Sequence, residues 1–224
     1  MVLLTTINMG FYKNAGGMSH PTTKHELVKE INIRLDRGQT NLNDIDTSKI
    51  TDMSALLFNF NQNIDISLWD VSNVRDMSYM FYGCDKLNCD FSRWNTGKVE
   101  RMDCMFCSCT NFNSDLSKWN VSNVKNMDCM FLNCTSFNCD LSKWDVRNVT
   151  NMSFMFSDCH KFNSDLSKWK VGNVRRMSDM FHNCKKFNSN LSKWDISKVI
   201  NMEYMFEGCD SFDFDSTEWS KEVD

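Results

Sequence analysis

The chain has 224 residues, of which 42% are hydrophobic and 24% are charged, which is enough for one domain or two small ones. Its formal net charge of −4 and its pI of about 5.6 argue against a nucleic-acid partner, because such proteins need a basic surface to displace counterions from phosphates. No stretch approaches the roughly 20 apolar residues that cross a bilayer, so no membrane insertion is expected.

Residues 1–20 carry no periodic pattern and are expected to be disordered. They contain neither the basic region nor the apolar run of a signal peptide. The 11 cysteines, an odd number, favour a reducing compartment, since an exported chain would leave one thiol unpaired. Taken as given, the chain is therefore expected to be cytoplasmic.

Residues 21–40 are predicted to contain an amphipathic helix that caps the rest of the chain. Thr23 and Glu26 have the spacing of a capping box, in which each side chain accepts a hydrogen bond from the other residue's backbone. Leu27, Ile31 and Leu35 then share one helical face, and Gly38 is a suitable stop. Such a helix would shield apolar surface and open strand edges.

Residues 41–219 are an array of about seven units of 25 residues, and residues 220–224 form a short tail. The seven tryptophans are spaced at that interval: Trp69, Trp94, Trp119, Trp144, Trp169, Trp194 and Trp219. Six cysteines keep the same step: Cys84, Cys109, Cys134, Cys159, Cys184 and Cys209. The first unit is atypical, because Met53 precedes Trp69 by 16 residues and not by 17. The last unit is more polar, as a terminal cap would be, owing to Asp213, Asp215, Glu218, Lys221 and Glu222.

Each unit combines two periodicities, which together predict one coil of a solenoid. Phe112 and Leu116 flank Ser114 at the spacing of a short strand with one buried face. The apolar residues from Val124 to Cys134 then step by three and four, which is typical of a short helical or 3₁₀ turn. Stacking the units would place the strands in a parallel sheet and bury the apolar side of each coil.

The regular columns are interpreted as packing. Free cysteine is among the most buried residue types, and an indole ring that recurs in every coil buries area while its N–H needs one acceptor. The columns in question include Trp94, Trp119, Trp144, Trp169, Trp194, Cys109, Cys134, Cys159 and Cys184.

Two other groups leave metal binding open as an alternative. Cys104, Cys107 and Cys109 form a C-x-x-C-x-C motif, and Cys129 repeats the Cys104 position. A column of carboxylates offers oxygen ligands of the kind that calcium takes. Its members are Asp65, Asp90, Asp115, Asp140, Asp165 and Asp215. The structural interpretation is favoured for both groups. The basic side chains of Arg93, Lys118, Lys143 and Lys168, three residues after four of the aspartates, or hydrogen bonds to the backbone at corners, would compensate the charge.

No catalytic site and no cofactor site are predicted, because the four histidines lie in unrelated settings and evenly distributed residues do not converge. Two columns vary from unit to unit. Varied side chains on a rigid repeat suit recognition of a protein partner, and neutral drift at exposed sites is the alternative. One runs Tyr79, Cys104, Cys129, Phe154, Asp179 and Tyr204, and the other Tyr82, Cys107, Leu132, Ser157, His182 and Glu207. The residues expected to bind the partner are Tyr79, Tyr82, Phe154, His182 and Tyr204.

The repeat resembles the BspA-family leucine-rich-repeat surface proteins, which overlap a domain of unknown function found in bacterial surface lipoproteins. The resemblance rests on the consensus W-D-V-S-N-V-x-N-M-x-x-M-F-x-x-C-x-x-F-N-x-D-L-S-x-W and on residues 44–54 as the usual start of the array, and it covers residues 23–219. It implies a cell-surface role in adhesion or protein interaction, with no shared catalytic residues. A non-catalytic interaction or adhesion module is thus expected; a metal-binding repeat protein and a self-assembling surface protein are the alternatives.

Overall fold

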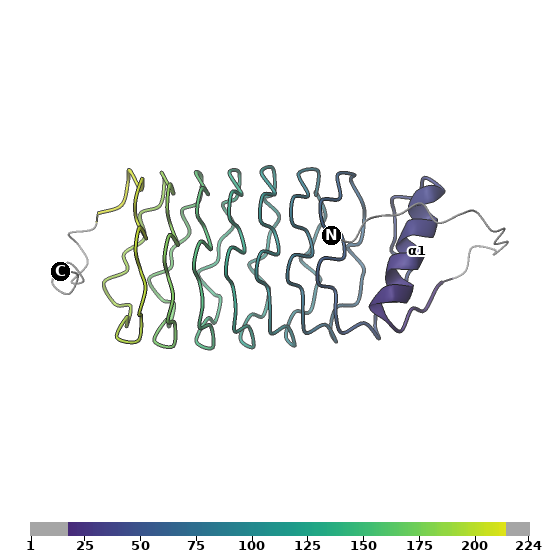
Figure 1. The fold of residues 1–224 in the computed structure, drawn as a ribbon, viewed down its shortest axis with the longest axis horizontal. Helices are drawn as coiled ribbons and strands as arrows, with labels where there is room; N and C mark the ends of the chain where they lie inside the picture. Colours follow the sequence, from purple (N-terminus) through teal and green to yellow (C-terminus); the bar gives the residue numbers. More distant parts are fainter. Residues whose placement is uncertain (1–17, 214–224) are drawn as a thin grey trace.

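The computed structural model describes residues 18–213, which form a stack of similar coils with one helix, α1 (Lys24–Asp36), across the N-terminal end (Figure 1). Isolated parallel bridges connect each coil to the next. One row of them runs along the stack through Asp52, Asp76, Arg101, Asn126, Asn151, Arg176 and Asn201. Neighbouring coils are therefore held in a fixed register, with equivalent residues side by side.

The helix α1 has the capping box that the sequence predicts. The Thr23 side chain accepts a hydrogen bond from the Glu26 amide, and the Glu26 carboxylate accepts one from the Thr23 amide. Leu27 and Ile31 are buried against the first coil, and Gly38, with φ of 74°, follows the helix. The helix therefore covers the apolar end of the array.

Residues 18–20 differ from the expected disorder of residues 1–20. Ser19 forms a parallel bridge with Ile45, and its carbonyl accepts a hydrogen bond of 2.8 Å from the Asp46 amide. His20 lies 2.8 Å from the Asp46 carboxylate. This short segment thus pairs with the first coil; residues 1–17 lie outside the described part of the chain.

Backbone hydrogen bonds between coils are concentrated in what we name the ladder segment, residues 101–108 and their equivalents. The amides of Met102, Cys104, Phe106 and Ser108 donate to carbonyls of the next coil at 2.7–3.1 Å. The amides of Met105 and Cys107 donate to the carbonyl three residues back, which closes successive tight turns. Cys104 and Ser108 have a left-handed backbone conformation, with φ of 53° and 59°.

The ladder corrects the expected placement of strand and helical turn. No strand is assigned over residues 112–116, and the residues from Val124 to Cys134 form bridges and turns in place of a helix. Consecutive three-residue turns repeat apolar side chains at steps of three and four, as a helix does, so the spacing alone does not distinguish the two conformations. The residues with a left-handed backbone turn the chain so that alternate amides point toward the next coil. The parallel pairing between coils therefore lies in this segment.

Side chains hold the coils together in the opposite part of each unit, the side-chain-bonded segment, which we define as residues 112–123 and their equivalents. The indole N–H of Trp119 donates to the Phe91 carbonyl at 3.1 Å, and Asn123 donates to the Gly97 carbonyl at 2.6 Å. In the coils from residue 87 to residue 198, no backbone–backbone hydrogen bond between coils lies in this segment. Here the register depends on side chains.

The core consists of stacked aromatic, methionine and valine columns. Phe131 stacks on Phe156 of the next coil with ring centroids 5.7 Å apart, and on Phe137 of its own coil at 4.1 Å. Trp144 is buried, at 3% exposure. Because each ring contacts rings before and after it, the core is continuous through the stack.

The irregular first unit reflects a missing residue. Asp52 pairs with Asp76, 24 residues on, whereas Asp76 pairs with Arg101, 25 residues on. Trp69 and Trp94 are again 25 apart, so the shortening lies before Trp69. At the other end, Asp213 is exposed, and the remaining residues of the expected polar cap, together with Trp219 and the tail 220–224, lie outside the described residues.

Candidate functional site: the variable face

The two varied columns lie side by side in the ladder segment, and we call them together the variable face. The Met and Phe columns that lie between them are fully buried, as Met105 and Phe106 are between Cys104 and Cys107, whereas the larger side chains of the two varied columns reach the surface. Tyr79, Phe154 and Tyr204 are exposed, at 39%, 37% and 64%. Tyr82 and His182 are half-buried. All five residues expected to bind a partner thus lie on one face.

The expected residues do not form one contact cluster. Tyr79 and Tyr82 have ring centroids 6.2 Å apart. Phe154 is three coils away from Tyr79 in the same column, with Cys104 and Cys129 between them. The face is therefore an elongated strip that follows the stack.

The first column of the variable face has a left-handed backbone throughout. The φ values are 53–59° at Tyr79, Cys104, Cys129, Phe154, Asp179 and Tyr204. A second left-handed column of the ladder holds, apart from Ser108, residues that tolerate this conformation well: Gly83, Asn133, Asp158, Asn183 and Gly208. Each aromatic or cysteine residue in the first column lowers the stability of the fold by about 1–2 kcal/mol relative to a residue that favours the left-handed conformation. Strain kept at exposed positions is typical of functional surfaces.

The N-terminal end of the variable face is aromatic. Phe58 stacks on Tyr82 with centroids 4.7 Å apart and ring planes 6° from parallel, and it is 42% exposed. Sequence reasoning missed Phe58, because it precedes Tyr82 by 24 residues and so falls out of a strict 25-residue alignment. The shortened interval between Met53 and Trp69 was the signal that could have placed it.

The middle of the variable face carries thiols. Cys104 and Cys107 are buried at 7% and 4% exposure, and Cys129 is half-buried. The pKa of Cys104 is lowered, chiefly by its hydrogen bond with the Cys129 thiol, whereas burial raises the pKa of Cys107. Of these three residues, only Cys129 therefore keeps a substantial exposed surface.

The C-terminal end of the variable face is acidic. His182 Nδ1 lies 3.9 Å from the Asp179 carboxylate and 4.0 Å from the Glu207 carboxylate. Burial raises the pKa of Asp179, and the nearby Glu207 carboxylate raises it further. Tyr204 and Glu207 are exposed beside them. The face therefore changes from aromatic to acidic along its length.

The thiols of the cysteine column donate hydrogen bonds to backbone carbonyls, and all but the half-buried Cys209 are buried. The Cys134 thiol donates to the Phe106 carbonyl of the preceding coil at 3.0 Å. Equivalent bonds of 2.8–3.0 Å are made by Cys84, Cys109, Cys159, Cys184 and Cys209. Burial raises the pKa of each of these thiols, to about 12 at Cys84. Their place is in the packing between coils, where a reactive thiolate is disfavoured.

The tryptophan column is buried and bonded in the same way. Each indole N–H donates to a carbonyl of the preceding coil, at 2.9–3.4 Å. The residues are Trp69, Trp94, Trp119, Trp144, Trp169 and Trp194. The acceptor that a buried indole requires is thus present in every described coil.

The aspartate column forms local turns. The Asp115 carboxylate accepts a 2.9 Å hydrogen bond from the Ser117 amide, two residues on, and this geometry recurs through the column. Hydrogen bonds from these serines lower the pKa of Asp115 and its equivalents, and the lysine three residues on, here Lys118, contributes less. Within residues 18–213, no three His, Cys, Asp or Glu side chains are placed to hold a metal ion together.

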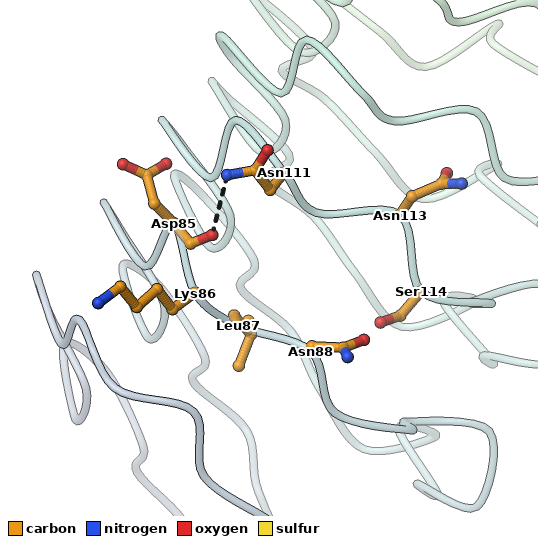
Figure 2. A pocket seen from close by; sticks show the side chains of 7 residues that line it. All are labelled: Asp85, Lys86, Leu87, Asn88, Asn111, Asn113 and Ser114. Carbon is orange, nitrogen blue, oxygen red and sulfur yellow. Dashed lines mark hydrogen bonds between the residues drawn. The ribbon is translucent and has the colours of Figure 1, made fainter.

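A shallow hollow of about 310 Å³ opens beside the ladder, lined by Asp85, Lys86, Leu87, Asn88, Asn111, Asn113 and Ser114 (Figure 2). Leu87 stands where the following coils have phenylalanine, so a ring is missing there. The Asp85 carboxylate already accepts hydrogen bonds from the amide and hydroxyl of Thr110. Lys86 extends away from Asn113 and Ser114 (Figure 2). The hollow therefore lies beside a smaller core residue, and its one basic side chain extends away from its far wall.

Stacked units in fixed register, with a face that varies from unit to unit, define the chain as a repeat protein. A family described as "Mycoplasma protein of unknown function, DUF285" matches residues 26–139 and 115–219, and the chain belongs to this family. No curated protein and no solved structure matches the chain. No helix within the described residues has the length and hydrophobicity to cross a membrane.

Proposed function

We propose that the chain is a non-catalytic interaction or adhesion module, a leucine-rich-repeat-like solenoid of the BspA type, that binds a protein partner through the variable face. The observation that carries this proposal is the left-handed column. Tyr79, Phe154 and Tyr204 occupy exposed positions whose backbone favours glycine or asparagine. Large side chains at such positions destabilise the fold, and partner binding gives a reason for them.

The chemistry of the variable face fits a protein surface. Aromatic side chains supply much of the energy in protein interfaces, because they bury a large area with little loss of rotamer freedom. Phe58, Tyr79 and Tyr82 offer such a group at one end, and Asp179 and Glu207 offer charge at the other. The matching partner would place apolar side chains on the first group and lysine or arginine on the second.

The partner can be sought by photo-crosslinking in cells that produce the protein. A photoreactive phenylalanine analogue replaces Phe154 in one variant and Lys143 in a matched control. Lys143 is exposed in the same part of the stack but belongs to the side-chain-bonded segment. We expect a specific protein to be crosslinked at position 154 and not at position 143.

Binding of the purified partner then tests the variable face directly. Replacing Tyr79 and Phe154 by serine is expected to raise the Kd at least about tenfold, as the loss of interface anchors does. Replacing Lys118 and Lys143 by serine is expected to leave it unchanged. Unaltered binding by a folded Tyr79/Phe154 variant would place recognition elsewhere. A second copy of the chain as the crosslinked product would favour self-assembly, which sedimentation at several concentrations would measure.

A further inference from the structure

The free cysteines of the described residues fall into two groups with different surroundings. The six of the cysteine column donate to backbone carbonyls in the core, and Cys89 and Cys139 are buried with their pKa raised to about 11. Cys104, Cys107 and Cys129 lie in the variable face instead. Thiol chemistry requires a thiolate that a reagent can reach, and in this second group Cys129 is half-buried whereas Cys104 and Cys107 are buried.

Cys104 and Cys129 are direct neighbours in consecutive coils. The Cys104 amide donates to the Asp128 carbonyl at 2.8 Å, and the Cys129 amide donates to the Ser153 carbonyl at 2.9 Å. Both residues have φ of 53°, so their side chains leave the ladder in the same direction. Parallel neighbours in register have Cα atoms about 4.8 Å apart, which lies within the range of about 4.4–6.8 Å that disulfides span.

The environment favours a thiolate in this pair. The pKa of Cys104 is lowered first by a hydrogen bond from the Cys129 thiol and, against the effect of burial, by one from the Tyr79 hydroxyl. The same hydrogen bond with Cys104, together with burial, raises the pKa of Cys129. The pair therefore loses its first proton more readily than a lone buried thiol, and Cys129 is the half-buried member that reagents can approach.

We propose that Cys104 and Cys129 form a thiol-exchange site that reacts with a low-molecular-weight disulfide and closes into a reversible disulfide between two coils. One thiolate of the pair attacks a sulfur of the small disulfide, which forms a mixed disulfide and releases one small thiolate. The second cysteine, deprotonated, then attacks the protein sulfur of the mixed disulfide and releases the other small thiolate. The two cysteines are oxidised to one disulfide, the small disulfide is reduced to two thiols, and the two protons pass to the released thiolates.

The same geometry makes the bond reversible. Disulfides require Cβ atoms about 3.5–4.5 Å apart, slightly closer than parallel neighbours in register. Closure therefore draws the two coils together locally against their ladder bonds, and strained disulfides are reduced more readily than relaxed ones. We expect the site to follow the redox state of its surroundings.

Peptide mapping of the full chain tests the proposal. The folded protein is incubated with oxidised glutathione, free thiols are blocked, and a non-reduced digest is analysed by mass spectrometry. We expect a crosslinked pair of peptides joined through Cys104 and Cys129, formed about tenfold faster than any modification of Cys89 or Cys139 and reversed by dithiothreitol. A bond between Cys104 and Cys107, or even modification of all cysteines, would overturn the assignment, and so would a folded chain that does not react.

Serine variants separate the two steps. Cys104→Ser is expected to abolish the crosslink and to leave a stable glutathione adduct at Cys129. Cys139→Ser, a matched change at a buried thiol outside the pair, is expected to leave the crosslink unchanged. The wild-type map requires no variant, so a variant that fails to fold does not affect the main result. If the crosslink persists in Cys104→Ser, the pairing is wrong.

Discussion

The ladder segment and the side-chain-bonded segment solve the same problem, the register between coils, by different means. In the ladder, backbone amides at alternate residues donate to the next coil, as Cys104 does to Asp128. In the side-chain-bonded segment, an indole or an amide side chain makes the bond, as Asn148 does to the Ser122 carbonyl at 2.7 Å. Any residue except proline can donate a hydrogen bond from its backbone amide, whereas the side-chain hydrogen bonds require a tryptophan or an asparagine at one position.

This difference explains where the sequence is constant and where it varies. Tryptophan and asparagine recur in the side-chain-bonded segment, because replacing them removes a bond between coils. The outer columns of the ladder segment contain aromatic, sulfur-containing, acidic and small residues, since their backbone bonds are independent of the side chain. A surface for recognition can therefore change there without loss of register.

The largest effect is expected at the tryptophan column. Trp144→Ala removes a buried ring and leaves the Leu116 carbonyl without its 3.1 Å donor, so we expect it to lower the free energy of unfolding by about 3–5 kcal/mol. Chemical denaturation measures this loss. Trp144→Phe keeps most of the apolar area and is expected to cost less, with the missing N–H accounting for about 1–3 kcal/mol. A change within about 0.5 kcal/mol for Trp144→Ala would show that this segment does not depend on its side chains.

The array and its constant columns could be predicted from the sequence, because the 25-residue step of Trp and Cys is independent of the local conformation. The conformation within a unit could not. Steps of three and four between Met127, Met130 and Cys134 fit a helix and a series of turns equally well. Tyr79 and Phe154 concealed the left-handed positions, since glycine or asparagine is the usual sign of them.

The candidate site was predictable in part. Variation between units identified the columns of Tyr79 and Tyr82, and both lie on one face. Phe58 was missed, because one residue is absent from the first unit and breaks the alignment. The burial of Cys104 and Cys107 was not foreseeable either, because it depends on how their larger neighbours pack around them.

A smaller effect is expected at the left-handed column, where two substitutions of Phe154 isolate the backbone. Phe154→Ala and Phe154→Gly both remove the ring, and they differ only in the Cβ atom at φ of 55°. We expect the glycine variant to be more stable by about 0.5–1 kcal/mol, because a left-handed backbone penalises the Cβ by more than glycine loses in chain entropy.

The neighbouring ladder supplies the matched control. Ser178 lies next to left-handed Asp179 and is not itself left-handed. Ser178→Gly is expected to be less stable than Ser178→Ala, which is the opposite order. Denaturant midpoints of the four variants measure both differences, and the same order at both positions would contradict the role given to the left-handed backbone.

The smallest effect per residue is expected from acid, and it distinguishes the two segments. Serine hydrogen bonds lower the pKa of the aspartate column below its ordinary value in the folded chain. A folded pKa that is lowered stabilises the fold above the unfolded pKa of about 4, and this contribution is lost as the pH falls through the folded value. We therefore expect the denaturant midpoint to fall as the pH is lowered from 5 to 3.

Asparagine at these positions provides the control, because its side chain accepts the same bond at every pH, as Asn190 does from the Ser192 amide at 3.0 Å. Replacing Asp90, Asp115 and Asp140 by asparagine is expected to flatten the acid dependence. Hydrogen exchange of single backbone amides then shows where in the coil the effect lies. In the wild-type chain, protection of the Ser117 amide against exchange is expected to fall in acid. Protection of the Phe106 amide in the ladder is expected to stay the same. Equal losses at both amides would mean that the two segments unfold as one unit, and the backbone bonds of the ladder would then not hold the coils independently of the side chains.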